Sequence, residues 1–194
     1  MNTSNNSLLE SVIVLELAMF LEVNNRGGIS PCQERPESFR IMREITHAVL
    51  SVDFLQSYLN DLTQARRHGR NLMTEKYALM EGLIPQLSNA PAIQDIVQAE
   101  SAWRKEVAAQ FPHAVHPDGH HSFCLYLSCE LQTYSPATLA AYAACVTTAR
   151  YEQRNLTRQR YELLMQKLGY GSLEQCEQQL ATTKQNDRAG IRNA

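Results

Sequence analysis

The strongest constraint on the fold of this chain is the length of its stretches without glycine or proline. The 194 residues contain 8 Gly and 7 Pro, and long stretches such as 37–68 and 137–168 contain neither. Within these stretches apolar residues recur at spacings of three and four, which is typical of helices packed on one face. The alternation of apolar and polar residues that indicates strands is almost absent. The sequence therefore predicts an all-α fold.

Periodicity, capping residues and helix breakers divide the chain into elements of a single domain. The first helix is expected to begin at a cap formed by Asn6 or Ser7, and a long helix to end at Gly169. Residues 7–184 are predicted to form one compact domain of seven or eight helices, with flexible ends at 1–6 and 185–194. The expected helices cover residues 7–24, 37–50, 52–67, 71–84, 91–111, 123–134, 136–168 and 172–184.

The composition is that of an ordinary globular protein. With 18 Lys and Arg against 20 Asp and Glu, the net charge is −2, so we expect no general attraction to nucleic acid or to anionic membranes. The 5 cysteines include no CxxC pair, which favours a reduced setting. The apolar run at 12–21 is too short to span a bilayer and lacks the basic flank of a signal peptide. These features predict a soluble cytoplasmic protein.

A carboxylate interrupts that apolar run, whose sequence is VIVLELAMFL. At helical spacing Glu16 shares a face with Val12, Ile13, Met19 and Phe20. An isolated buried carboxylate costs several kcal/mol, so Glu16 should be paired, hydrogen-bonded or protonated. It could form a structural ion pair between helices, act as a general acid, base or ligand, or lie at an interface with a partner.

Other predicted helices repeat this pattern of charge among apolar residues. In NLMTEKYALM, Glu75 lies one turn from two leucines and beside Lys76 and Tyr77; in LYLSCELQTY, Glu130 precedes Tyr134 by four. In SFRIMREITHAVL, Arg43 lies one turn from a phenylalanine and a histidine. Buried charges are tolerated when they are networked, and such clusters are enriched at active sites. We therefore expect a buried polar cluster; a set of helix-to-helix salt bridges is the alternative.

Two irregular segments supply further candidates. In NNRGGISPCQ, the paired glycines could turn backbone N–H groups toward an anion, and Cys32 could expose a thiol. We expect Gly28, Cys32 and Gln33 to line a pocket, although a tight turn between helices would also explain the glycines. In HAVHPDGHH, four histidines and one aspartate could hold zinc or another divalent metal, but the spacing fits no strict zinc signature. A solvated or substrate-facing loop is the alternative.

Four segments, ELAMFLEVNNRGGISPCQ, FRIMR, YLNDLTQARRHGRNLMTEKYALM and ELQTYS, together resemble a bacterial family catalogued as domain of unknown function 4125. The resemblance extends over about residues 12–170. Ala18 stands where the family pattern has a second carboxylate, which leaves Glu16 as the carboxylate of that turn. The resemblance implies a small helical bacterial protein and brings no activity with it. The matching positions are Asn24, Gly27, Gly28, Cys32, Gln33, Arg43, Gly69, Arg70, Asn71, Leu72, Glu75, Lys76 and Tyr77.

The leading functional hypothesis is an enzyme that acts on a small polar, anionic metabolite by acid–base chemistry. Glu16, Glu75 and Tyr77 are the predicted catalytic residues, with Glu16 first for proton transfer. Arg43 would hold a carboxylate or phosphate of the substrate through a bidentate contact. A lyase, isomerase or hydrolase would fit, without an organic cofactor, because no nucleotide-binding motif is present. The predicted substrate-binding residues are Asn24, Gly28, Cys32, Gln33, Arg43, Arg70, Asn71, Lys76, Glu130 and Tyr134.

Two other functions stay open at this point. One is a non-catalytic accessory or regulatory protein that binds a partner helix through an exposed apolar stripe. The other is a metal-dependent enzyme that uses the carboxylates together with the loop between His113 and His121. A homodimer is also left open, and a small-molecule substrate is the expected partner.

Overall fold

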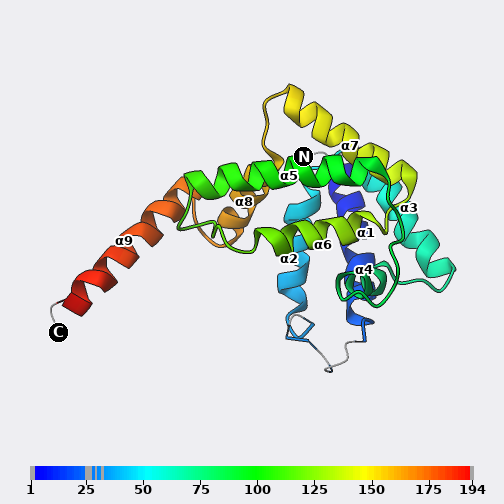
Figure 1. Cartoon of the computed structure of the whole chain (residues 1–194), viewed down its shortest axis with the longest axis horizontal. Helices are drawn as coiled ribbons and strands as arrows, with labels where there is room; N and C mark the ends of the chain where they lie inside the picture. The colour runs from blue at the N-terminus through cyan, green and yellow to red at the C-terminus, as the bar shows by residue number, and fades with distance from the viewer. Residues whose placement is uncertain (1–2, 25–27, 29, 32, 193–194) are drawn as a thin grey trace.

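The computed structural model describes residues 3–24, 28, 30–31 and 33–192, with side chains from residue 5 to residue 183 of these. This part of the chain consists of α-helices joined by short connections, without strands (Figure 1), so the predicted all-α class is confirmed. The nine helices are α1 (Thr3–Leu21), α2 (Pro36–His47), α3 (Val52–Arg67), α4 (Leu72–Met80), α5 (Pro91–Gln110), α6 (His120–Leu131), α7 (Pro136–Tyr151), α8 (Leu156–Lys167) and α9 (Leu173–Arg192).

The prediction of one long helix over 136–168 is wrong, and it accounts for the difference from seven or eight helices. The chain turns between α7 and α8, where Gln153 adopts a positive φ of 55°. Asn155 then caps α8, because its side chain accepts a hydrogen bond from the Arg158 N–H at 2.8 Å. The segment contains neither glycine nor proline, so the usual helix-breaking signals did not reveal this turn.

Smaller differences occur at the helix ends. α1 begins at Thr3, before the cap expected at Asn6 or Ser7, and α9 extends to Arg192, beyond the expected end at 184. α6 begins at His120, directly after Gly119, whose φ of 81° sets the turn into the helix. Such shifts are ordinary, because local sequence determines the ends of a helix less strongly than its apolar face.

The helices form two groups that meet around the centre of the molecule. α1 packs against α2, α3 and α4, and α5 packs against α6, α7 and α8. Contacts between α3 and α7, α4 and α6, and α2 and α8 join the groups. In Figure 1, α5 and α6 run across the view in front of α1 and α2, while α9 projects from the body. Among these described helices, none has both the length and the apolar character needed to cross a bilayer.

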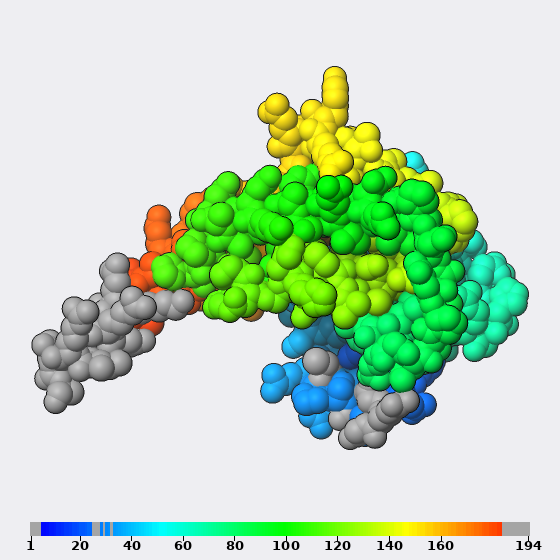
Figure 2. All heavy atoms as spheres, viewed as in Figure 1, coloured from blue at the N-terminus to red at the C-terminus, as the bar shows by residue number. Residues whose placement is uncertain are grey.

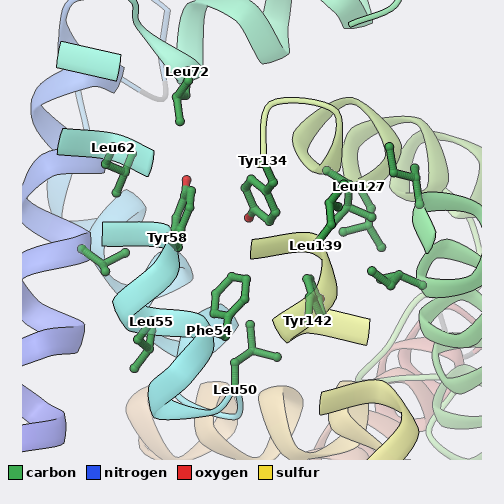
Figure 3. Packing of buried hydrophobic residues seen from close by; sticks show 14 of the residues in the cluster. Leu50, Phe54, Leu55, Tyr58, Leu62, Leu72, Leu127, Tyr134, Leu139 and Tyr142 are labelled. Atoms are coloured by element: carbon green, nitrogen blue, oxygen red, sulfur yellow. The ribbon is translucent and has the colours of Figure 1, made fainter. Parts of the chain in front are cut away.

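The main hydrophobic core contains a row of aromatic residues from α3 and the segments facing it. Phe54 and Tyr58 lie against Tyr134 and Tyr142, with ring centroids 4.7 Å apart for Tyr58 and Tyr134 and 5.3 Å apart for Phe54 and Tyr142 (Figure 3). The three tyrosine rings are buried in this core, and each hydroxyl bonds to a buried carboxylate. The core therefore positions hydrogen-bond donors for charged groups beside it.

Candidate functional site

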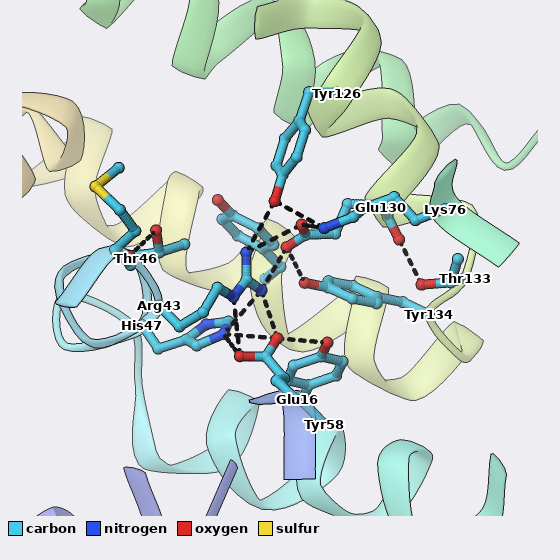
Figure 4. A network of polar contacts seen from close by, with 12 residues as sticks. Glu16, Arg43, Thr46, His47, Tyr58, Lys76, Tyr126, Glu130, Thr133 and Tyr134 are labelled. Carbon is cyan, nitrogen blue, oxygen red and sulfur yellow. Dashed lines mark hydrogen bonds and ion pairs between the residues drawn. The ribbon is translucent and has the colours of Figure 1, made fainter. Parts of the chain in front are cut away.

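Glu16 lies at the centre of the molecule and is 0% exposed. Arg43 from α2 donates to both of its oxygens, from Nε at 2.9 Å and from Nη2 at 2.5 Å, and the Tyr58 hydroxyl donates at 2.8 Å (Figure 4). His47 Nε2 lies 3.1 Å from the carboxylate. Burial by itself would raise the pKa of Glu16, but Arg43 and His47 outweigh it and hold the pKa at about 2. Glu16 is therefore an ionised carboxylate that accepts from four N–H and O–H groups of three residues, which fills its acceptor capacity.

Arg43 joins Glu16 to a second buried carboxylate, Glu130 of α6. The Nη1 and Nη2 atoms of Arg43 lie 3.1 and 2.9 Å from the two oxygens of Glu130. Lys76 of α4, which is 0% exposed, donates to Glu130 at 3.2 Å, and the Tyr134 hydroxyl donates at 2.9 Å. Burial would raise the pKa of Glu130, but Arg43 and Lys76 keep this pKa well below its ordinary value.

These side chains form a closed set, which we call the charge network: Glu16, Arg43, His47, Tyr58, Lys76, Tyr126, Glu130 and Tyr134 (Figure 4). Its two carboxylates match the two cations Arg43 and Lys76. Tyr126 accepts from Lys76 Nζ at 2.7 Å, and burial raises the pKa of its hydroxyl. Since the charges balance and are hydrogen-bonded, the network can remain ionised away from water.

One atom of this network lacks a partner. His47 is 0% exposed, and its Nδ1 is buried without a hydrogen bond to any described residue. Its Nε2 lies 3.0 Å from Arg43 Nη2 as well as near Glu16. The two Nη2 protons already point to Glu16 and Glu130, and a carboxylate can only accept. We therefore place a proton on Nε2, which donates a hydrogen bond to Glu16. Nδ1, the other ring nitrogen, then has no hydrogen-bond partner among the described residues.

A second cluster, which we call the Glu100 cluster, consists of Glu100, Tyr142, Thr157 and Arg160. Arg160 Nη1 lies 2.6 Å from Glu100, and the hydroxyls of Tyr142 and Thr157 donate to this carboxylate at 2.9 and 3.0 Å. Burial would lower the pKa of Arg160, but Glu100 raises this pKa above its ordinary value. The cluster ties α5, α7 and α8 together, again with one carboxylate matched by one cation.

The charge network and the Glu100 cluster both reach a cavity of about 580 Å³. On α2 the lining residues recur at helical spacing from Arg35 to His47, so one face of this helix runs along the cavity. Arg35, Ser38 and Met42 are exposed, whereas Arg43 and His47 are buried, so the cavity is open along the first half of α2 and closes near the end of this helix. In Figure 2 the surface is recessed below α6, beside α2. The lining residues are Phe20, Pro31, Arg35, Ser38, Phe39, Met42, Arg43, Thr46, His47, Leu50, Tyr77, Glu100, Phe123, Tyr126, Leu127, Glu130, Tyr134, Tyr142 and Arg160.

The family described as protein of unknown function (DUF4125) matches residues 6–178 of the chain. The chain belongs to the DUF4125 family. The match covers every residue of the charge network, the Glu100 cluster and the cavity wall. Neither the curated proteins nor the solved structures give a match to the chain. The resemblance identified from the sequence is thus confirmed at the level of the DUF4125 family.

The structure brings together six of the thirteen sequence-predicted site residues. Glu16, Arg43, Lys76, Glu130 and Tyr134 meet in the charge network, as their positions in apolar stretches indicated. Tyr77 lines the cavity beside Phe20, at a ring-centroid distance of 6.3 Å, and burial raises the pKa of its hydroxyl. These six residues come from α1, α2, α4 and the end of α6, which the sequence could not place side by side.

Other predicted site residues have structural positions elsewhere. Asn71 caps α4 by accepting from the Thr74 N–H at 2.9 Å and donates to the Met19 carbonyl at 2.8 Å. The amide of Gln33 donates to the Phe20 and Val23 carbonyls at 3.1 and 2.9 Å, at the end of α1. Asn24 and Gly28 are exposed, and Arg70 and Glu75 pair with each other, so these four residues do not join the charge network. Cys32 lies outside the described residues.

A substitution of Glu75, a predicted catalytic residue, tests whether this residue lies outside the charge network. Both of its oxygens accept from Arg70 at 2.7 Å, and the Arg70 side chain is 52% exposed. Replacing Glu75 by Gln is expected to change the free energy of unfolding by less than about 1 kcal/mol, as for other exposed ion pairs. Urea denaturation of the variant checks this, and a loss of several kcal/mol would show that Glu75 supports the buried network.

The described residues hold no group of three or more His, Cys, Asp and Glu side chains arranged to bind a metal. In the histidine-rich segment, His116 Nδ1 lies 3.3 Å from Asp118 and His120 Nε2 lies 3.1 Å from Ser101. The buried carboxylates Glu16 and Glu130 are filled by cationic side chains, so a metal there would have to compete with Arg43 and Lys76.

Sequence reasoning did not select His47, Tyr126 or the Glu100 cluster. A signal for Glu100 was available, because it lies at helical spacing from Ile96, Trp103 and Val107, the pattern that identified Glu16. His47 was visible as one turn from Arg43, but the unpartnered nitrogen is a property of the fold. The signal available for Glu100 also marks Arg160, which lies four residues after Leu156 and three before Leu163.

Proposed function

We propose that this DUF4125 protein is an enzyme that acts by acid–base chemistry on a small organic molecule bound in the cavity. His47 would be the base and Glu16 its positioning residue. The supporting observation is that His47 lines the cavity, with Nε2 held by a buried carboxylate and Nδ1 without a partner among the described residues. A carboxylate that fixes the tautomer and orientation of an imidazole is a recurrent arrangement for general bases.

This proposal gives Glu16 a different role from the one its sequence position suggested. Glu16 is absent from the cavity wall, and its oxygens already accept from Arg43, His47 and Tyr58. With a pKa of about 2 it is too weak a base to take a proton near neutral pH. It would instead hold the Nε2 proton of His47 and stabilise the imidazolium that forms when Nδ1 accepts a second proton.

The contacts of Arg43 also change the expected substrate. Its five N–H groups point to Glu16, Glu130 and Tyr126, so it has no donor left for a substrate carboxylate or phosphate. Most cavity-lining side chains away from the network are apolar or aromatic, including Phe39 and Phe123. We therefore propose a substrate with a mainly apolar body that presents its reacting group to His47.

Two substitutions of His47 distinguish the roles of its two ring nitrogens. In His47→Gln the side-chain amide can still donate to Glu16, while the group at the Nδ1 position is lost. In His47→Asn the amide lies near the Nδ1 position but is too short to reach Glu16. We expect His47→Gln to fold with a loss of about 1 kcal/mol or less and His47→Asn to lose about 1–3 kcal/mol, because only Asn leaves a buried carboxylate short of a donor.

The chemical test uses a library of small aromatic and aliphatic compounds, screened by thermal shift. Compounds that raise the melting temperature are incubated with the protein in deuterium oxide and followed by NMR and mass spectrometry. We expect deuterium exchange or conversion of at least one bound compound with the unmodified protein and none with His47→Gln. If bound compounds remain unchanged by the unmodified protein, the cavity belongs to a non-catalytic receptor and the proposal fails.

A further inference from the structure

The charged side chains around the cavity are balanced except at its mouth. Inside, Arg43 and Lys76 pair with Glu16 and Glu130, and Arg160 pairs with Glu100. Within the described residues, Arg35 is the one charged side chain of the cavity wall without an ion pair or hydrogen bond. The closed end therefore offers no net charge to a ligand, whereas the open end offers one positive charge.

The backbone at the mouth favours the same sign of charge. α2 begins at Pro36, which has no N–H, and its N-cap Arg35 makes no side-chain capping bond. The carboxylate of Glu37 in the same turn lies 4.0 Å from Arg40, and Glu37 is not part of the cavity wall. The first N–H groups of a helix have no partner within the helix, and the aligned peptide dipoles place partial positive charge there. Ser38, one turn into the helix, also lines the cavity and adds a hydroxyl donor. The guanidinium of Arg35 and the hydroxyl of Ser38 thus line the same end of the cavity, at the N-terminus of α2.

The cavity links this position to His47. The lining face of α2 runs from Arg35 to His47, twelve positions further along the chain, which corresponds to about 18 Å at the rise of an α-helix. Arg35, Ser38 and Met42 are exposed on this face, Phe39 is half-buried and His47 is buried. Phe39 stacks on Phe20 at a centroid distance of 4.3 Å, so the wall between the two ends is apolar and ordered.

We infer that the ligand is an elongated amphipathic organic anion, with its anionic group at Arg35 and its apolar body along α2. This inference rests on the proposed function and names the substrate class. The buried unpartnered nitrogen of His47 is the second observation that points to a ligand in this cavity. The reacting group of the ligand then lies at the end opposite to its anionic group, next to His47, whose Nδ1 has no hydrogen-bond partner among the described residues. A carboxylate, a sulfate and a phosphate would be recognised in the same way, since Arg35 and the start of α2 interact with negative charge and with acceptor oxygens.

The test compares dodecanoate with dodecanol, two molecules of equal chain length that differ in charge, below their aggregation limits. Isothermal titration calorimetry is expected to show about five- to tenfold tighter binding of dodecanoate, the range for one exposed ion pair combined with a helix N-terminus. The preference should shrink at high salt. Arg35→Ala is expected to remove the preference, and Arg35→Glu to reverse it, while both variants still bind dodecanol.

The matched control is Arg40→Ala, which removes an arginine of the same helix that is not part of the cavity wall and pairs with Glu10 instead. It should keep the preference for dodecanoate. Methionine methyl resonances report the location: Met42 in the cavity wall should shift on binding, while Met73 in the core, 1% exposed, should not.

Equal binding of the two probes by the unmodified protein, an unchanged preference in Arg35→Ala, or an unshifted Met42 methyl would each overturn the inference. The proposed function is tested separately by deuterium exchange with the His47 variants. A preference that depends on Arg35, found together with no chemistry on any bound compound, would support the anion site and reject the enzyme.

Discussion

Replacing Arg43 by Met is expected to lower the free energy of unfolding by about 3–5 kcal/mol, the range for a buried ion pair that loses one partner. Among the described residues, Arg43 is the one arginine or lysine in contact with Glu16, and it also bonds both oxygens of Glu130. Met fills a similar volume but offers no donor, so the buried Glu16 would lose its arginine and Glu130 would keep Lys76 as its one cation. Urea denaturation at neutral pH measures the loss.

Arg40→Met is the matched control for this prediction. Arg40 lies on the same helix, one turn before Arg43, but its side chain is 31% exposed and pairs with the exposed Glu10. Its replacement should cost about 1 kcal/mol or less. The double variant Glu16→Gln with Arg43→Met should lose less than the sum of the single losses, because one unpaired carboxylate is removed. A protein with Arg43→Met that is as stable as the unmodified chain would instead indicate that these charges are strained for function.

The second large effect is the loss of stability in acid. The pKa of Glu16 falls from its ordinary 4.5 to about 2 on folding, so the folded state holds the ionised form more strongly than the unfolded state does. The stabilisation is complete above pH 4.5 and is lost as the pH falls through about 2. A shift of this size corresponds to about 3 kcal/mol. Glu130, whose pKa is also lowered, adds to the loss in the same direction.

The measurement is the free energy of unfolding by urea at a series of pH values from neutral to about 2.5. Glu16→Gln should be less stable at neutral pH and should show a shallower decline in acid, since Gln does not titrate. Glu10→Gln removes an exposed carboxylate of the same helix and should leave the decline in place. An equally steep decline in Glu16→Gln would mean that Glu16 is not held ionised by its partners.

The sequence predicted the fold class because helical periodicity is a local property. Long stretches without glycine or proline, with apolar residues at spacings of three and four, could bury their surface as packed helices. The same periodicity identified Glu16, Arg43 and Glu130 as charges on buried faces. Their need for partners followed from the cost of burying a charge, so a common network was a physical expectation before any contact was known.

Local sequence could not choose between faces where a helix is apolar almost all round. α4 has the sequence LMTEKYALM, and its short length gives Glu75 and Lys76 similar apolar neighbours. The fold buries Leu72, Met73 and Lys76 against its neighbours and leaves Glu75 to pair with Arg70 outside. Glu75, a predicted catalytic residue, is therefore placed away from the charge network, because periodicity shows which residues share a face but not which face is covered.

The sequence by itself determined that the chain is helical, that it belongs to the DUF4125 family and that several of its charges must be buried together. Only the tertiary structure decided which charges pair, because the partners of Glu16 come from α2 and α3 and those of Glu130 from α2 and α4. The cavity and the unengaged nitrogen of His47 also exist only there, since both arise from space and contacts among segments distant in sequence. The local sequence pattern determines which face of each helix is apolar, and the packing of segments distant in sequence determines which residues that face contacts.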